Sequence, residues 1–258
     1  MSDINIRTVD HAGRITLKRP KALNAVTLDM IRAMAAALPR FAADPRVKLV
    51  VIDAEGDKAF SAGGDIAGIY EDLTHDRYDQ VRNFWREEYP LNAAIANFPK
   101  PVVTLMQGFT MGGGVGVGCH ASHRIVGETS RIAMPECTIG LVPDVGGSLI
   151  LARAPGRLGE YLGLTGARMG PGDAIRVGFA DHYVEESRWP DLLTHLEEVG
   201  DVGLIQRSAT PPPEPELEQT QIDQHFGAET LTEIIDSLAG DKSEWSADTL
   251  KTLARNAP

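Results

Sequence analysis

Two glycine-rich turns constrain the fold of this sequence more than any other feature. Residues 61–65 (SAGGD) come after the mostly apolar run 47–53, and residues 111–116 (MGGGVG) come after the apolar run 102–106. Apolar runs of strand length are typical of strands buried on both faces, as in parallel sheets. The second turn leads into a helix predicted from about Gly113. The recurring order of strand, glycine turn and helix favours an α/β architecture.

Local signals predict several other elements. Residues 4–9 and 14–18 read as a hairpin, and Thr27 is the expected N-cap of a helix that runs to about residue 42. A long helix is expected over 78–97, ended by two nearby prolines. Shorter strands are expected at 124–126 and 132–133, and shorter helices at 149–152, 157–164, 172–176, 222–226, 228–238 and 247–254.

A proline-rich acidic run, TPPPEPE at residues 210–216, marks a change in composition. Such runs are typical of semi-rigid linkers. We therefore predict three parts: a core over residues 1–205, a linker over 206–221, and a short C-terminal helical segment over 222–258.

The charge balance argues against two classes of partner. With 25 Lys and Arg against 36 Asp and Glu, the formal net charge is −11, so neither nucleic acid nor an anionic membrane is an expected partner. The sequence has no apolar run of about 20 residues and no leader pattern at its start. Cys119 and Cys137 are its only cysteines, which predicts a reducing compartment and no metal site. We expect a cytoplasmic protein, or a mitochondrial-matrix one in a eukaryote, although no transit peptide is seen.

The glycine turns are candidates for an oxyanion-binding site. A thioester carbonyl under attack gathers negative charge on its oxygen, and two converging N–H donors stabilise that charge. Gly64 and Gly113 each follow a predicted strand and can supply one donor. Either turn taken alone reads equally as a tight turn without a ligand. Both together, with acidic residues downstream, favour a site for acyl chemistry.

Two carboxylates eight residues apart, Glu136 and Asp144, are the candidate catalytic groups. Glu136 follows a proline in a segment with little local charge, where burial would raise its pKa and suit a base or nucleophile. Asp144 precedes Val-Gly-Gly and reads alternatively as a turn or helix-cap residue. By pattern alone, Glu88 is a solvated helix charge, His120 a core histidine, and Asp65 a turn or cap residue.

A competing interpretation is a dinucleotide fold. Residues 116–121 fit G-x-G-x-x-A after a strand, but the pattern begins inside the predicted helix instead of at its N-terminus. Lys18, Arg19, Lys21 and Lys58 form either a local basic patch for an anionic ligand or a set of scattered solvated charges.

These turns, together with residues 21–25 (KALNA), resemble the crotonase (enoyl-CoA hydratase/isomerase) superfamily. The resemblance implies a crotonase-like ββα superhelix with a C-terminal helical segment, often assembled as trimers or paired trimers. It implies an acyl-CoA substrate with no separate cofactor, and a thioester carbonyl held between the N–H groups of Gly64 and Gly113. It also places the CoA nucleotide near Lys21, Ala22, Leu23 and Lys58.

The superfamily's hydratases carry two catalytic glutamates, and the positions that match them here are Gly116 and Glu136. The broken pair argues against water addition to an enoyl double bond. Residues 63–66, 84–89, 111–116, 134–147 and 164–168 are most similar to the 3-hydroxyisobutyryl-CoA hydrolases. That similarity implies substrate contacts by Glu88, Gly113, Glu136 and Asp144.

The resulting expectation is a hydrolase of a short β-hydroxyacyl-CoA thioester, with 3-hydroxyisobutyryl-CoA as the first candidate. Glu136 would be the nucleophile or the base, a choice that the sequence leaves open. The alternatives are an enoyl-CoA hydratase or isomerase and a CoA-binding relative with weak catalysis. Hydrolases of this type usually continue with a further helical segment after the point that matches Pro258, so a more open CoA site is also expected.

Overall fold

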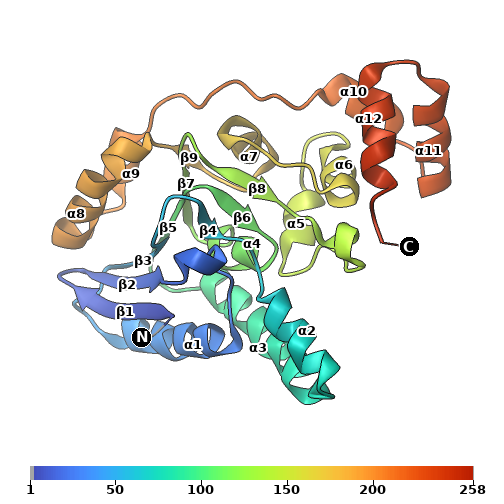
Figure 1. Ribbon diagram of the computed structural model, residues 1–258. Coiled ribbons are helices and arrows are strands. Elements are labelled where there is room, and N and C mark those ends of the chain that lie inside the picture. The colour runs from blue at the N-terminus through green and yellow to red at the C-terminus, as the bar shows by residue number, and fades with distance from the viewer. Residues whose placement is uncertain (1–2, 258) are drawn as a thin grey trace.

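Two β-sheets, one of six strands and one of three, form the centre of the molecule. A computed structural model describes residues 3–257 (Figure 1). The larger sheet has the order β1-β2-β3-β5-β7-β9, and the smaller has the order β4-β6-β8. The strands of the larger sheet are β1 (Ile4–Val9), β2 (Ala12–Leu17), β3 (Leu49–Ala54), β5 (Val102–Met106), β7 (His123–Val126) and β9 (His182–Tyr183). Those of the smaller sheet are β4 (Ala59–Ser61), β6 (Phe109–Met111) and β8 (Arg131–Ala133).

The strand pairs β3–β4, β5–β6 and β7–β8 repeat one pattern. The first strand of each pair joins the larger sheet and the second joins the smaller sheet. The β1–β2 hairpin is antiparallel, whereas the other strand pairs are parallel. This winding confirms the predicted α/β class and ββα superhelix.

Helices enclose both sheets. They are α1 (Leu28–Ala43), α2 (Ile66–Thr74), α3 (Tyr78–Ala96), α4 (Gly113–Gly118), α5 (Gly147–Leu151), α6 (Leu158–Thr165), α7 (Pro171–Val177), α8 (Trp189–Val199), α9 (Gly203–Ser208), α10 (Gln219–His225), α11 (Leu231–Gly240) and α12 (Glu244–Leu253). Short 3₁₀ turns lie at Pro20–Ala22, Glu136–Ile139 and Glu186–Arg188. The predicted cap is confirmed, because the side chain of Thr27 accepts a hydrogen bond from the N–H of Met30.

Helices α2, α8 and α9 were not predicted from the sequence. The signal for α2 is present: Asp65 caps its N-terminus, and apolar residues follow at helical spacing. Helices α8 and α9 cover the outer face of the larger sheet, where Trp189 and Leu196 pack in one core cluster with Val51 and Val103. Their place depends on burial against that sheet, which local sequence does not reveal.

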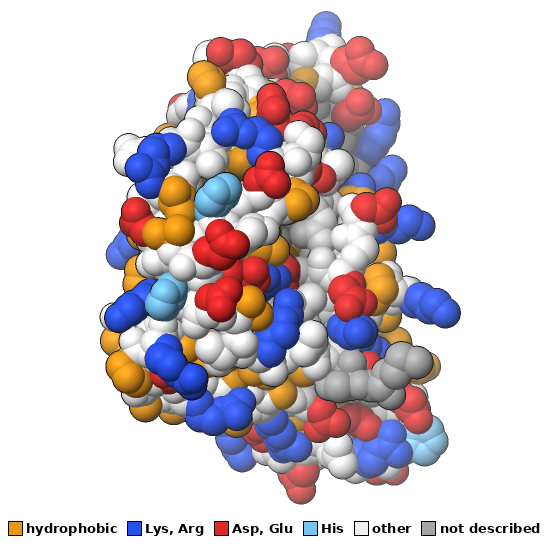
Figure 2. All heavy atoms as spheres, turned by 90° about the vertical axis from the view of Figure 1, so that its left-hand side faces the viewer, with side chains coloured by type: hydrophobic (Ala, Val, Ile, Leu, Met, Phe, Trp, Pro, Cys, Tyr) orange, Lys and Arg blue, Asp and Glu red, His pale blue; other side chains and the backbone are white. Residues whose placement is uncertain are grey.

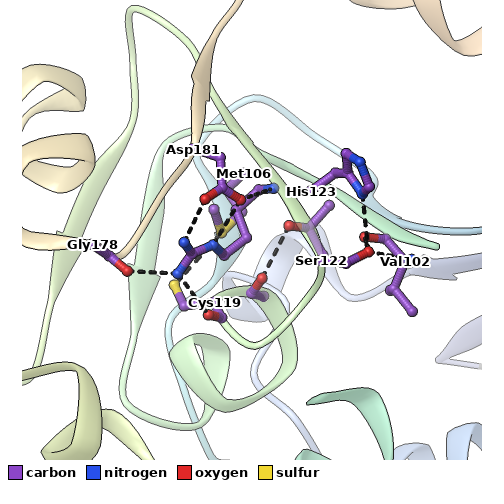
Figure 3. A network of polar contacts seen from close by, with 10 residues as sticks. Val102, Met106, Cys119, Ser122, His123, Gly178 and Asp181 are labelled. Carbon is purple, nitrogen blue, oxygen red and sulfur yellow. Dashed lines mark hydrogen bonds and ion pairs between the residues drawn. The ribbon is translucent and has the colours of Figure 1, made fainter. Parts of the chain in front are cut away.

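An ion pair fastens the end of the larger sheet to the loop after α7. The guanidinium of Arg124 donates to both carboxylate oxygens of Asp181, at 2.5 and 2.9 Å. It also donates to the carbonyl oxygens of Cys119 and Gly178 (Figure 3). This contact fixes the C-terminal end of α4, whose opposite end carries the glycine turn.

The chain crosses the molecule between α9 and α10 without regular secondary structure and then forms α10, α11 and α12 beside α6 (Figure 1). The ring of Tyr161 in α6 packs edge-on against Phe226 and is stacked on Trp245. The boundaries of the three predicted parts stay a prediction.

The surface mixes both signs of charge. Figure 2 shows one face, on which Lys and Arg side chains are interspersed with Asp and Glu side chains. Among residues 3–257, no helix is long and apolar enough to cross a membrane.

Candidate active site

The first glycine turn lies beside the loop that leads into α1. The carbonyl oxygen of Gly63 accepts from the N–H of Val26, and the N–H of Asp65 donates to the carbonyl oxygen of Val26. These bonds engage the backbone on both sides of Gly64. Gly63 has φ of 109°, and a Cβ on it would lie 2.9 Å from the carbonyl oxygen of Met111. Only glycine lets the two turns come this close.

The second glycine turn faces the first. A Cβ built on Gly113 would lie 3.0 Å from the nitrogen of Gly64. Within residues 3–257, the N–H groups of Gly64 and Gly113 donate to no other protein group. Gly113 is the first residue of α4, so its N–H has no partner inside the helix. Two unpaired amide donors therefore lie side by side.

Glu88 points from α3 toward the second turn. Its Oε1 lies 2.7 Å from the position that a Cβ of Gly113 would occupy. The residue is 2% exposed, and Oε1 has no hydrogen-bond partner among the described residues. Burial, helped by the charges of Asp144 and Glu136, raises the pKa of Glu88 to about 8. The solvated-charge interpretation of Glu88 is therefore wrong.

Glu136 also contacts the second turn, at the preceding residue Gly112. It begins the 3₁₀ turn after β8, and its Oε1 lies 2.8 Å from where a Cβ of Gly112 would be. Its other carboxylate oxygen, Oε2, is buried without a partner in the described structure. Burial, helped by the charge of Asp144, raises the pKa of Glu136 to about 7. A carboxyl that titrates near neutrality can exchange a proton during a reaction.

Asp144 lies at the edge of this group and is oriented by a tyrosine. The hydroxyl of Tyr89 donates to Oδ2 of Asp144 at 2.7 Å. The N-cap of α5 is Gly146, and no side chain caps that helix, so the helix-cap interpretation of Asp144 is wrong. Sequence reasoning assigned no role to Tyr89. Its partner lies 55 residues away, beyond the reach of any local pattern.

One cavity, of about 510 Å³ with its open mouth, brings these groups together. Ile69, Phe84, Trp85 and Ile139 are among the apolar side chains of its wall. The sequence-predicted residues that line it are Gly64, Glu88, Gly113, Glu136 and Asp144. Two amide donors, apolar side chains and two carboxyls with raised pKa values thus line one cavity.

The four residues predicted to contact CoA lie on loops beside the cavity and are not part of its wall. Lys21, Ala22 and Lys58 are exposed, and Leu23 is half-buried. Asn24 joins the two loops, because its Nδ2 donates to the carbonyl oxygens of Glu55 and Ala59. The carbonyl oxygen of Leu23 accepts from the N–H of Ala62. The two lysine-bearing loops are therefore neighbours, and one of them contacts the first glycine turn.

Other candidates from the sequence have structural positions. Asp65 accepts from the N–H of Gly68 and pairs with Arg19 at 2.9 Å, so it is a cap residue. His120 forms a 2.7 Å hydrogen bond from Nε2 to the carbonyl oxygen of Val145, and burial lowers its pKa. Gly116 is buried inside α4, which removes the dinucleotide interpretation of residues 116–121.

Comparison with known proteins identifies the family of the chain. The family model described as enoyl-CoA hydratase/isomerase matches residues 12–258. The chain belongs to this family. The 3-hydroxyisobutyryl-CoA hydrolase of Xenopus tropicalis, described as mitochondrial, is 42% identical over 96% of this chain and 67% of its own length. The corresponding human protein, also described as mitochondrial, is 40% identical over 95% of this chain and 67% of its own length.

Solved structures share the fold over the whole chain. A crystal structure of an enoyl-CoA hydratase from Rhodobacter sphaeroides 2.4.1 has a TM-score of 0.92 and 56% identity, covering 100% of this chain and 75% of that one. A carnitinyl-CoA dehydratase from Mycobacterium thermoresistibile has a TM-score of 0.96 and 37% identity, covering 100% and 76%. The relatives therefore carry names from two reaction types, hydrolysis of a thioester and addition or removal of water.

Proposed function

We propose that the chain hydrolyses the thioester of a short β-hydroxyacyl-CoA, with 3-hydroxyisobutyryl-CoA as the preferred substrate. One observation carries the proposal: two unpaired amide N–H groups and two buried carboxyls converge in a single cavity. The names of the relatives that are 40–42% identical give it independent support. The product pair would be the hydroxy acid and free CoA.

The amides of Gly64 and Gly113 would bind the thioester oxygen. Neither has an acceptor in the part of the chain that the structure describes, so both can stabilise the charge that develops when the carbonyl carbon is attacked. A donor of this kind contributes roughly 100-fold or more to a rate. The position of Gly113 at the start of α4 adds the favourable end of a short helix dipole.

Glu136 would act on the carbonyl carbon in its ionised form. In one route it attacks that carbon, expels the CoA thiolate and forms an anhydride, which water then hydrolyses. In the other route it takes a proton from a water molecule that attacks directly. A single turnover in ¹⁸O-water separates the two routes, because only the anhydride route can leave the label in the side chain of Glu136.

Asp144 and Glu88 would hold the acyl group. The hydrogen bond from Tyr89 fixes one oxygen of Asp144 and leaves the other available for the substrate hydroxyl. Glu88 has a pKa raised to about 8 and so keeps its proton at neutral pH, which lets it donate a hydrogen bond inside the apolar cavity.

The basic loops would hold the CoA nucleotide outside the cavity mouth. Lys21 and Lys58 are exposed on neighbouring loops, where their charges would attract phosphates. We expect Lys21→Glu to raise the Kd for CoA in calorimetry. The surface residue Lys242 offers a control, and Lys242→Glu should leave that Kd unchanged. A cytoplasmic or matrix location and a trimeric assembly remain predictions, and light scattering of the purified chain tests the assembly.

Thiol release tests the central proposal. Free CoA is measured with 3-hydroxyisobutyryl-CoA, isobutyryl-CoA, acetyl-CoA and crotonyl-CoA under one set of conditions. We expect the hydroxylated substrate to release CoA fastest. A hydratase would instead consume crotonyl-CoA without thiol release. Hydration of crotonyl-CoA is therefore measured in parallel, because the solved structure that is 56% identical bears the name of an enoyl-CoA hydratase.

A further inference from the structure

Helices α3 and α4 contact each other at two positions. At each position a glycine of α4, which has no side chain, lies against a polar side chain of α3. At the first position, Glu88 faces Gly113, as described above. At the second position, a Cβ on Gly116 would lie 2.7 Å from Nδ2 and 2.9 Å from Oδ1 of Asn92. Asn92 follows Glu88 by four residues, so the two side chains share one face of α3.

Asn92 is buried without partners. It is 4% exposed, and neither Nδ2 nor Oδ1 forms a hydrogen bond with another described residue. An unpaired polar group in the interior destabilises a fold by about 1–3 kcal/mol. Leucine has the same branched shape and number of side-chain heavy atoms, and it would avoid this cost. The unpaired carboxamide is therefore available to a ligand that both accepts and donates hydrogen bonds.

Asn92 lines a second cavity next to the first. Asp144 and Val145 belong to the walls of both cavities. The second cavity is mostly apolar, with Ala93, Ala96, Val142 and Leu149 among its lining residues. Two of its other polar groups already have partners, since the hydroxyl of Tyr89 donates to Asp144 and Nε2 of His120 contacts the carbonyl oxygen of Val145.

We propose that the carboxamide of Asn92 binds a hydroxyl group at the junction of the two cavities. Nδ2 would donate to the hydroxyl oxygen, and Oδ1 would accept its proton. A hydroxyl matches both unpaired atoms, whereas a carbonyl oxygen or an ammonium group matches only one. Asp144, which lines both cavities, offers an alternative acceptor for the hydroxyl proton beside Oδ1.

This inference rests on the proposed function, which offers two sources for the hydroxyl. One is the β-hydroxyl of the acyl group, which lies three bonds from the thioester carbonyl carbon. Four residues of α3, about 6 Å along its axis, separate Asn92 from Glu88, which is within the length of a short acyl chain held at Gly113. The other source is the water molecule that hydrolyses the thioester.

Paired binding and rate measurements test the inference. Binding of 3-hydroxyisobutyryl-CoA and isobutyryl-CoA is measured by calorimetry in a Glu136→Gln background, where turnover is suppressed. Rates of thiol release are measured with Glu136 intact. The variants are Asn92→Leu, which removes both polar atoms, and Asn92→Asp, which keeps the shape of the side chain and an acceptor and serves if the first fails to fold. Asn97→Leu serves as the control, because Asn97 lies exposed at the end of the same helix.

If Asn92 binds the substrate hydroxyl, the parent binds the hydroxylated ligand roughly tenfold more tightly, the range of one good hydrogen bond. Asn92→Leu then reduces this preference to within about twofold. If Asn92 binds water, the preference is unchanged, and kcat falls by the same factor for both substrates with KM unchanged. Asn97→Leu should change neither quantity.

A folded Asn92→Leu or Asn92→Asp protein that keeps both the hydroxyl preference and both rates would overturn the inference. So would a parent without hydroxyl preference whose rates do not respond to Asn92. The proposed function fails separately, if wild-type protein releases no thiol from any substrate. In that case the calorimetric preference still reports whether Asn92 recognises a hydroxyl.

Discussion

The polar groups buried around His225, among α10, α11 and α12, are paired, whereas several of those buried around Gly113 and α3 are not. His225 is 2% exposed, and its ring contacts Ser237 Oγ at 2.9 Å and Asp241 Oδ2 at 3.4 Å. Asp241 also accepts from the hydroxyls of Ser243 and Ser246, at 2.7 Å each. In contrast, Glu88, Glu136 and Asn92 each leave at least one buried polar atom without a partner among residues 3–257.

We interpret this difference as one of role: the paired side chains stabilise the fold, and the unpaired ones bind a ligand. In a fully hydrogen-bonded network such as that of His225, bonds within the folded chain offset the free-energy cost of removing its polar groups from water. For the polar side chains around Gly113, the cost of removal from water is not offset until a ligand forms hydrogen bonds with them. Changes in the first region should therefore alter stability with little effect on turnover, whereas changes to the unpaired polar groups of the second region should alter turnover.

The largest expected effect is the loss of turnover in Glu136→Gln. The amide keeps the shape of the side chain but can serve neither as base nor as nucleophile, so the rate of thiol release should fall roughly 100-fold or more. Calorimetry should show CoA binding close to that of the wild type, since the proposed nucleotide loops are unchanged. A fully active Glu136→Gln protein would remove this residue from the mechanism.

The paired region gives the opposite expectation. His225→Ala removes a buried ring that is stacked on Trp245, together with its hydrogen bonds. We expect the free energy of unfolding to fall by about 2 kcal/mol, the low end for losing a large buried side chain. Denaturant titration measures this loss. Below the unfolding transition, kcat/KM should stay within about twofold of the wild type. A larger fall in kcat/KM would contradict the idea that the His225 network serves stability alone.

Much of the scaffold follows from local sequence, and much of the site does not. The cap at Thr27, the β1–β2 hairpin and the buried strands β3 and β5 depend on neighbours along the chain, so pattern predicts them. The burial of Glu88 depends on α4 packing against α3, and the bond between Tyr89 and Asp144 joins residues 55 positions apart. Asn92 did leave a signal, because it lies four residues from Glu88 on the predicted long helix.

The packing of α3 on α4 predicts a smaller effect at Gly116. A Cβ there would come within 2.9 Å of both Asn92 and Val145, so Gly116→Ala should lower the free energy of unfolding by about 1–2 kcal/mol through overpacking. Thermal unfolding measures the change. Gly240 supplies the control, because a Cβ there meets nothing within 4 Å. Equal stability of Gly116→Ala and the wild type would show that α3 can move away from α4.

The smallest expected effect is a change in how stability depends on pH. The folded-state pKa values of Glu88, about 8, and Glu136, about 7, lie above the ordinary glutamate value. Between that value and pH 8 the folded state therefore binds more protons than the unfolded state, and stability from these groups falls as the pH rises. Glu88→Gln should thus raise Tm relative to wild type at pH 8.5 more than at pH 5.5.

Glu87, the neighbouring residue, supplies a control of opposite sign. Its exposed carboxylate is bonded to Arg32, and that hydrogen bond lowers its pKa. The contribution of Glu87 is therefore present at neutral pH and lost as the pH falls through its folded pKa. Glu87→Gln should lower Tm slightly at pH 8.5, where Glu88→Gln raises it. If Glu88→Gln and wild type show the same Tm difference at both pH values, Glu88 is not held protonated by burial. In that case, the lack of a hydrogen-bond partner for Glu88 would have no effect on its pKa.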